Sequence, residues 1–306
     1  MIKYYTKDVI DIFDLKTNYI LCVADLYFAV ESFKDDYTMQ VYKDYIVDSI
    51  PKGQSAYKLS CTVTDTPLTS PSGTKLTDRE ECNWYTTDLG KYSQFFYDSV
   101  NKCHCALLNF DNTQRCGEII LYDVKKVYGV DTQFLLYNIM ERLFRLAILF
   151  NDGFVLHASS IVYKGFGLAF SALSGVGKST HTGLWLEHYH DVYILNDDCP
   201  ALRCVDGIWY MYGAPWAGTT GINVNSKVPV KALIFLERSE KNSIRDCEAS
   251  ESVKRIFEAV ANPVSDEITN LIFASLSSFL MSSKVCVLGC NISKEAPQTV
   301  ERYLFN

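Results

Sequence analysis

The chain has 306 residues and a formal net charge of −7, with 29 basic and 36 acidic side chains. Domains that bind nucleic acid concentrate Lys and Arg on one face, and this sequence has no dense basic cluster, so a DNA or RNA partner is disfavoured. A chain of this length is long enough for two domains.

The N-terminal residues lack the apolar core of a signal peptide, and no uninterrupted apolar span approaches the ~20 residues needed to cross a bilayer. We therefore expect a cytoplasmic protein without a membrane partner. The eleven cysteines are odd in number and scattered along the chain, which predicts reduced thiols. Cys103, Cys105 and Cys116 have a spacing that allows a zinc site. Because alternate residues of a strand share a face, packing of two small apolar side chains is the favoured interpretation.

Residues 1–130 are predicted to form a β-rich domain, in which we recognise no functional motif. A polar turn over residues 111–117 predicts a hairpin between the last two strands, and residues 67–73 are the most linker-like loop. The aromatic side chains of this region are interpreted as packing. Strands are expected at Tyr19–Ala24, Met39–Val47, Tyr57–Val63, Cys103–Phe110 and Glu118–Val124.

A helix that connects two domains is expected over residues 131–150. Asp131 is a favourable N-cap, and Leu135, Ile139, Leu143 and Leu146 recur on one stripe of the helix. A second apolar stripe lies beside the first, so the helix needs cover on two sides. The domain boundary is therefore expected within this helix, with the second domain spanning residues 151–306.

The second domain contains a glycine-rich motif, Ala172-Leu-Ser-Gly-Val-Gly-Lys-Ser179, between an apolar run at 167–170 and a predicted helix at 178–190. Such a turn directs successive backbone amides at phosphate oxygens at a helix N-terminus. The motif predicts that Lys178 reaches the β- and γ-phosphates and that Ser179 ligates Mg²⁺. Ala172 replaces the usual first glycine. The residues expected to hold a nucleotide are Ser174, Gly175, Val176, Gly177, Lys178, Ser179 and Thr180.

Two features on either side of this loop suggest chemistry. The apolar run from Val192 ends in the carboxylates Asp197 and Asp198, an arrangement that places one acid on Mg²⁺ and the other beside the γ-phosphate. Upstream, His157 lies at the end or edge of a predicted strand. The helix after the loop carries further histidines, which we interpret as lying on a solvated face and in the following turn rather than in a metal site. These are His181, His188 and His190.

The combination of His157, the glycine loop, Asn-Asp-Asp at 196–198 and Gly-x-Pro-Trp at 213–216 resembles the catalytic domain of HPr kinase/phosphorylase. The chain is more similar still to the HPr-kinase-like proteins found beside peptide-modification genes. The resemblance covers about residues 150–306 and implies an α/β fold of the phosphoenolpyruvate-carboxykinase type. It also implies phosphoryl transfer from ATP to a serine hydroxyl. In this family pattern Asp197 is the base with His157 close to it, and Asp198 acts through Mg²⁺ held jointly with Ser179.

The segments after the acidic pair leave several alternatives open. A hairpin with an Asp206-Gly207 turn is expected, and its Arg203 either approaches phosphate or lies on the surface. The glycine-rich segment 213–221 is either a mobile loop that opens toward the site or a plain connector. The resembling proteins often have a basic residue after this segment's Pro-Trp, where this chain has Thr219. The substitutes, which we do not rank, are Lys227, Lys231 and Arg238.

A strand at 228–236, helices at 250–261 and 266–281, a strand at 284–291 and a helix at 295–304 complete the expected α/β layer. The favoured function is an ATP- and Mg²⁺-dependent kinase acting on a serine of a peptide or small carrier protein, with Asp197, His157 and Lys178 as catalytic residues. Two alternatives stay open: a kinase of a small hydroxylated metabolite such as free serine, and a non-catalytic nucleotide-binding regulator. A homo-oligomer is compatible with each.

Overall fold

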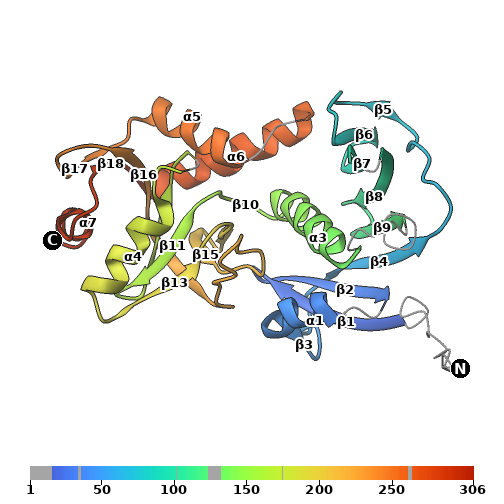
Figure 1. The fold of residues 1–306 in the computed structure, drawn as a ribbon, viewed down its shortest axis with the longest axis horizontal. Coiled ribbons are helices and arrows are strands. Elements are labelled where there is room, and N and C mark those ends of the chain that lie inside the picture. The colour runs from blue at the N-terminus through green and yellow to red at the C-terminus, as the bar shows by residue number, and fades with distance from the viewer. Residues whose placement is uncertain (1–15, 34–35, 101, 123–131, 174, 261–263) are drawn as a thin grey trace, which may run out of the picture. The chain divides into compact units, whose positions relative to one another are not determined.

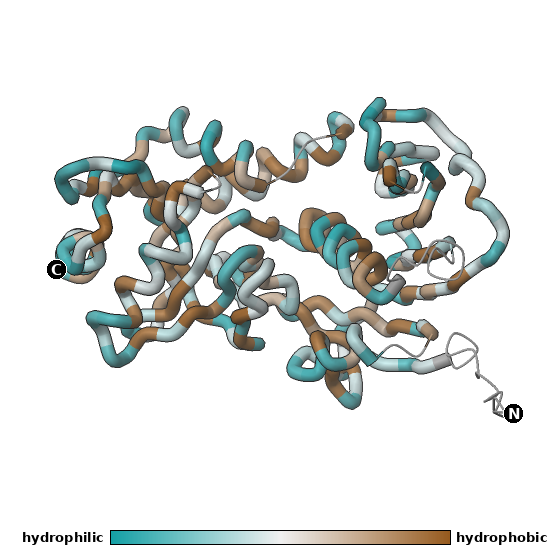
Figure 2. Tube along the Cα trace, in the orientation of Figure 1, coloured by the Kyte–Doolittle hydropathy of each residue, from teal (hydrophilic) through white to brown (hydrophobic). Residues whose placement is uncertain are grey.

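The computed structural model describes residues 16–33, 36–100, 102–122, 132–173, 175–260 and 264–306 (Figure 1). The protein is a mixed α/β chain with two large sheets. Its contacts define two compact units, one comprising Met1–Cys22 with Tyr27–Leu143 and the other Val23–Leu26 with Phe144–Asn306. Helix α3 (Thr132–Leu149) contributes residues to both units. Hydrophobic and hydrophilic positions alternate along α3 (Figure 2). The predicted N-cap Asp131 lies outside the described residues.

The first unit is built on a nine-stranded sheet with the order β3-β1-β2-β4-β9-β8-β7-β6-β5. Alternation sets its two faces: Tyr57 and Leu59 in β4 are buried, whereas Lys58 between them is exposed. The predicted hairpin is confirmed as the antiparallel pair β8 and β9. The strands are β1 Lys16–Val23, β2 Leu26–Phe33, β3 Ile46–Val47, β4 Ala56–Thr64, β5 Thr74–Lys75, β6 Cys82–Asp88, β7 Lys91–Asp98, β8 Cys103–Asp111 and β9 Cys116–Tyr122.

The strand predicted over Met39–Val47 is wrong for most of its length. This segment contains helix α1 (Asp36–Tyr42) and the 3₁₀ helix η2 (Lys43–Tyr45), and only β3 is extended. The buried side chains are Thr38, Tyr42 and Tyr45, which are three or four residues apart and therefore share one face of a helix. Burial of these side chains on one helical face outweighed the high β propensity of the aromatic residues.

The cysteines of β8 and β9 do not gather into a metal cluster. Cys105 is buried, and its burial raises the pKa of its thiol to about 12. Cys103 and Cys116 are half-buried. Within the described residues, no group of three or more His, Cys, Asp or Glu side chains is arranged to hold a metal ion. All eleven cysteines lie in the described part of the chain, and no disulfide joins any of them.

Titration of the denatured protein with a thiol reagent, without reductant, should therefore count close to eleven groups. Most of these thiols react slowly in the folded protein, since burial raises their pKa and the thiolate is the reactive form. A count that stays well below eleven after full denaturation, in protein purified anaerobically, would contradict this prediction.

The second unit contains a sheet with the order β10-β14-β15-β16-β12-β11-β13, to which β18 is added beside β16 and β17 beside β18. The hairpin predicted around Asp206-Gly207 is confirmed as β14 and β15, and both turn residues have positive φ. The strands are β10 Gly153–Val155, β11 Ser159–Tyr163, β12 Phe166–Ser171, β13 Val192–Asn196, β14 Ala201–Val205, β15 Ile208–Tyr212, β16 Lys227–Arg238, β17 Ser243–Asp246 and β18 Lys284–Cys290.

Besides the end of α3, the described part of this unit contains the helices α4 Lys178–His188, α5 Ala249–Val260, α6 Asp266–Ser282 and α7 Glu295–Phe305. Each lies where the sequence predicts a helix, within a few residues. Ser265 caps α6, because its side chain accepts a hydrogen bond from the amide of Ile268. Across the described residues, no helix combines the length and the apolar character that crossing a bilayer requires.

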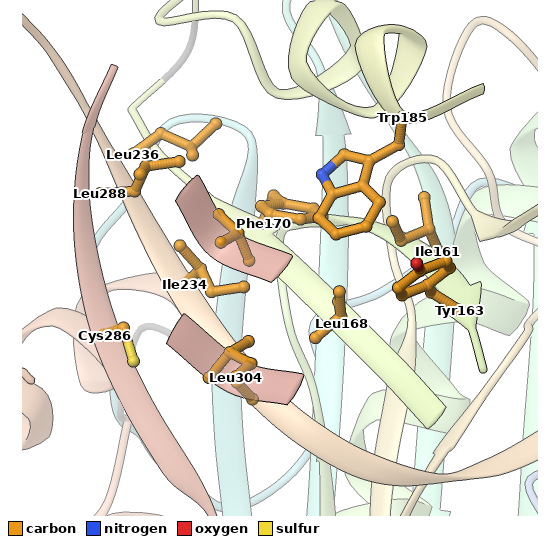
Figure 3. Packing of buried hydrophobic residues seen from close by; sticks show 12 residues of the cluster. Ile161, Tyr163, Leu168, Phe170, Trp185, Ile234, Leu236, Cys286, Leu288 and Leu304 are labelled. Atoms are coloured by element: carbon orange, nitrogen blue, oxygen red, sulfur yellow. The ribbon is translucent and has the colours of Figure 1, made fainter. Parts of the chain in front are cut away.

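Helix α4 packs onto the sheet through Trp185, which is fully buried. Its indole lies against Phe170 of β12 and Tyr163 of β11 (Figure 3). Because Trp185 is the largest apolar side chain of α4, its burial stabilises the packing of the helix on the sheet more than the burial of any other side chain of the helix. This cluster therefore fixes α4, and with it the glycine loop that precedes the helix.

His181 does not lie on a solvated face, which corrects the prediction for this residue; His188 and His190 are exposed as expected. The imidazole of His181 is 3% exposed, its Nε2 accepts a hydrogen bond from Trp185 Nε1 at 3.2 Å, and its ring packs on Phe170. Because burial disfavours the charged imidazolium, the pKa of His181 falls from 6.5 to about 4.

Acidification should therefore destabilise the second unit through His181. Between pH 6.5 and about 4 the unfolded chain protonates this residue and the folded chain does not, so stability present above pH 6.5 is lost as the pH falls. Between about pH 7 and 4.5, the wild type should lose roughly 2 to 3 kcal/mol more of its free energy of unfolding than His181→Gln does. Urea unfolding at both pH values measures this difference. Equal losses in the two proteins would refute it.

Candidate active site

One edge of the second unit's sheet gathers the residues that the sequence singles out. Strands β12, β16 and β18 are parallel, and β13 runs in the same direction because both β12 and β13 are antiparallel to β11. Their carboxyl ends meet at the same edge, which is where open α/β sheets bind ligands. The glycine loop follows β12, the acidic pair follows β13, and His157 lies just before the start of β11, at that same edge.

The glycine loop has the backbone conformation that the motif predicts. Gly175 and Gly177 have φ of 77° and 118°, in the left-handed region that other residues avoid. Gly177 is the N-cap of α4, so the first amides of the helix, with the positive end of its dipole, lie next to the loop. Ser179 and Thr180 are exposed in the first turn. Ser174, also expected to bind the nucleotide, lies outside the described residues.

Lys178, His157 and Asp198 form a continuous chain of polar contacts. Lys178 Nζ lies 3.0 Å from His157 Nε2, and His157 Nδ1 lies 3.1 Å from Asp198 Oδ1. Because an ammonium only donates, Nε2 accepts and Nδ1 carries the proton that is donated to Asp198. The hydrogen bond from His157 is the main reason why the pKa of Asp198 is lowered. Burial lowers the pKa of Lys178, while the charges of Asp198 and Asp197 oppose this effect.

Asp197 occupies a different environment. It is 7% exposed, and its Oδ1 accepts a hydrogen bond of 2.6 Å from Ser159 Oγ. Ser159 Oγ also lies 3.1 Å from Thr182 Oγ1, whose hydroxyl contacts the carbonyl of Ser179 in the first turn of α4. The resemblance implies that His157 lies close to Asp197, but the contact in the structure is with Asp198. The two carboxylates thus face different groups, as expected for neighbours at a strand end.

Asn196 is the residue that shapes the acidic turn, and its role was not predicted from the sequence. Its Oδ1 accepts hydrogen bonds from the amides of Asp198 and Cys199, and its Nδ2 donates to the carbonyls of Ala214 and Trp216. An asparagine before two acids at a strand end is the local signal for such a turn. Asn196 therefore joins the acidic pair to the segment 213–221, which lies against the site.

Gly218 of that segment approaches Asp198 closely. It has φ of 60°, and a Cβ added there would lie 3.0 Å from the Asp198 Cβ and Cγ. A glycine is therefore required here on two grounds, the backbone conformation and the space taken by the carboxylate. The segment 213–221 thus packs closely against the acidic pair.

Of the basic residues considered from the sequence, Arg238 reaches the glycine loop. Its Nη2 donates a hydrogen bond of 2.7 Å to the carbonyl of Gly175. Lys227 instead pairs with Asp25, and Lys231 lies over the rings of Phe166 and Phe305. Arg203 is committed to backbone carbonyls, including that of Asn151, and does not approach the loop. The position of Arg238 at the end of β16 explains the difference, since that end lies at the site edge.

Two adjoining clefts flank the glycine loop, and Val176 lines both. The first, which we call the α4 cleft, has a volume of about 620 Å³ and is lined by Thr180, Leu184 and Ile292 among others. The second, the α5 cleft, has a volume of about 830 Å³, and its lining includes His157 and residues of helix α5. Both clefts have apolar and charged lining residues, and His157 lines only the α5 cleft.

The side chains at this edge suit a magnesium-bound nucleotide. Mg²⁺ prefers oxygen ligands and is commonly held by one or two carboxylates together with substrate phosphates. Ser179, Asp197 and Asp198 supply such oxygens next to the glycine loop. A cage of three or more acids, which the described residues do not contain, is not needed for this mode of binding.

No family model matches the chain, and no curated protein matches it. Among solved structures, the chain is similar to the Hpr(Ser) kinase/phosphatase from Coxiella burnetii, with a TM-score of 0.30 and 12% sequence identity. That match covers 49% of this chain and 95% of the other. The functional conclusion therefore rests on the residues of the site.

Proposed function

We propose that this protein is an ATP- and Mg²⁺-dependent phosphotransferase that transfers the γ-phosphate to a hydroxyl group. The observation that carries the proposal is the link from Lys178 through His157 to Asp198 at the mouth of the glycine loop. The imidazole of His157 thereby lies between Lys178, a cation for the phosphates, and Asp198, a carboxylate for the acceptor. Phosphoryl transfer needs little beyond such positioning and charge stabilisation.

The contacts favour a division of labour between the carboxylates that is the reverse of the one implied by the resemblance. Asp198 takes the proton of the attacking hydroxyl, because it is the carboxylate hydrogen-bonded to His157 and it is partly exposed. Asp197 lies beside the first turn of α4 through Ser159 and Thr182, so it is the better candidate to share Mg²⁺ with Ser179. The bound Mg²⁺ would neutralise charge on the phosphates.

A carboxylate with a lowered pKa can serve as this base. The transition state of phosphoryl transfer is loose in most analyses, and we infer that the hydroxyl proton is lost late, so a strong base is not required. His157 holds Asp198 by donating from Nδ1, while Lys178 holds the tautomer by donating to Nε2. Each of the three side chains thus fixes the orientation of the next.

The acceptor that we propose is a serine of a peptide or small carrier protein, with a small hydroxylated metabolite such as free serine as the alternative. A non-catalytic nucleotide-binding regulator is less well supported, since binding alone needs neither His157 nor Asp198. The nucleotide is proposed to contact Gly175, Val176, Gly177, Lys178, Ser179 and Thr180.

The test is transfer of label from γ-labelled ATP, with Mg²⁺, to serine-containing peptides and to free serine, compared with release of phosphate to water. Label on a hydroxyl supports the proposal. Tight binding of ATP with transfer to none of these acceptors, nor to water, would leave the regulator as the function and refute the kinase.

A further inference from the structure

The α4 cleft and the α5 cleft share part of their lining, including Leu236, and what assigns the two ends of the reaction is that Thr180 lines only the α4 cleft and His157 only the α5 cleft. The α4 cleft adjoins the first turn of α4 through Thr180 and has apolar side chains of its own from Leu184 and Ile292, which suit a nucleoside. The reacting end of the site is marked by His157, which lines the α5 cleft. A phosphate chain lying in the loop between the two clefts would therefore point its terminal phosphate at the α5 cleft.

We propose, on the premise of the phosphotransferase function above, that the α5 cleft binds the phosphoacceptor and that this acceptor is an extended peptide segment rather than a free amino acid. The volume of about 830 Å³ is that of a cleft which buries a drug-sized ligand, several times larger than free serine. Helix α5 forms one wall and is tied to the site, because the amide of His157 donates to the carbonyl of Ala259 at 3.2 Å. An exposed leucine of the glycine loop, Leu173, also lines this cleft.

The charges on the α5 wall fall into two groups. Arg255 and Glu251 are engaged with each other, and Glu237 and Arg245 complete their network of ion pairs. Lys254 and Glu258 line the same cleft, are exposed, and form no ion pair with any other described residue. They are four residues apart and therefore neighbours on one face of the helix. These two side chains are available to meet charges on an incoming peptide.

The order of Lys254 and Glu258 along α5 indicates which of them lies nearer to the reacting hydroxyl. Glu258 precedes Ala259, whose carbonyl contacts the His157 backbone, so it lies near the reacting hydroxyl, and Lys254 lies one helical turn farther away. A serine peptide with an acidic residue should therefore depend on Lys254, and one with a basic residue should depend on Glu258. Lys254 and Glu258 are positioned to set specificity and do not touch the reacting atoms.

The experiment measures kcat/KM for two short serine peptides, one with aspartates and one with lysines flanking the serine, and for free serine. In Lys254→Glu, the ratio of acidic-peptide to basic-peptide kcat/KM should fall about tenfold, because an attraction at a partly exposed pair becomes a repulsion. In Glu258→Lys the ratio should rise by a similar factor. Both effects should shrink at high salt. Because both kcat/KM values are measured on the same preparation, their ratio does not change if part of a variant is unfolded.

Lys52→Glu is the matched control, because it makes the same charge change on an exposed lysine in the other unit. Its ratio should equal that of the wild type. If both α5 variants keep the wild-type ratio, or if free serine is phosphorylated as efficiently as the peptides, the acceptor assignment fails while the phosphotransferase proposal stands. If ATP binds but no acceptor is phosphorylated, both proposals fail.

Discussion

Replacing Lys178 with Ala should abolish phosphoryl transfer and weaken the binding of Mg–ATP. The ammonium lies at the mouth of the glycine loop, where a positioned cation offsets the charge that develops on the transferred phosphate. It also orients His157, so its loss releases the imidazole from one of its two partners. We expect transfer to fall on the order of 10³-fold or more, at the upper end of the range for the loss of one group that stabilises the transition state.

Single-turnover transfer and calorimetry with Mg–ATP measure the two effects separately. Lys164→Ala is a suitable control, since Lys164 lies in the turn between β11 and β12, at the opposite end of β12 from the glycine loop, and pairs there with Glu301 of α7. Normal turnover by Lys178→Ala would exclude the proposed role of the loop, whatever happened to nucleotide affinity.

The second large effect is a contrast between the two carboxylates. Asp198→Asn should bind Mg–ATP and transfer phosphate slowly, on the order of 10²-fold or more below wild type, as expected when a general base is removed. Asp197→Asn should instead lose the Mg²⁺-dependent part of nucleotide binding. The physical reason is that Asp198 faces His157 at the acceptor side, whereas Asp197 faces Ser159 and the first turn of α4.

Calorimetric titrations with and without Mg²⁺, followed by single-turnover transfer, distinguish the two variants. Asp191→Asn serves as a control, because Asp191 is an exposed acid at the other end of the same strand. If Asp197→Asn binds Mg–ATP normally but transfers phosphate slowly, and Asp198→Asn loses Mg²⁺-dependent binding, then Asp197 is the base and Asp198 the Mg²⁺ ligand, as the resemblance implies. Two variants with unimpaired transfer would remove both carboxylates from the mechanism.

Local sequence was sufficient to predict much of the second unit. The glycines of the loop are needed because their φ angles are positive, and this requirement is visible in the motif itself. Helices α4, α6 and α7 and the strand β16 follow from periodicity and end signals that act within a few residues. The prediction from local sequence was wrong where packing favoured another structure. In Met39–Val47 the buried aromatic residues have helical spacing, and most of the segment is helical and not a strand.

The pairing of the site residues was decided by tertiary structure alone. Asp197 and Asp198 are adjacent in sequence and chemically identical, and only the approach of β11 gives one of them Ser159 and the other His157. Likewise, the three basic residues Lys227, Lys231 and Arg238, spread along β16, were equivalent from sequence, and the direction of β16 brings Arg238 alone of these to the loop. Sequence determines which chemical groups are present and the local backbone that carries them, because both depend on near neighbours. Which groups meet depends on strand order and register, which are set by contacts between residues far apart in the chain.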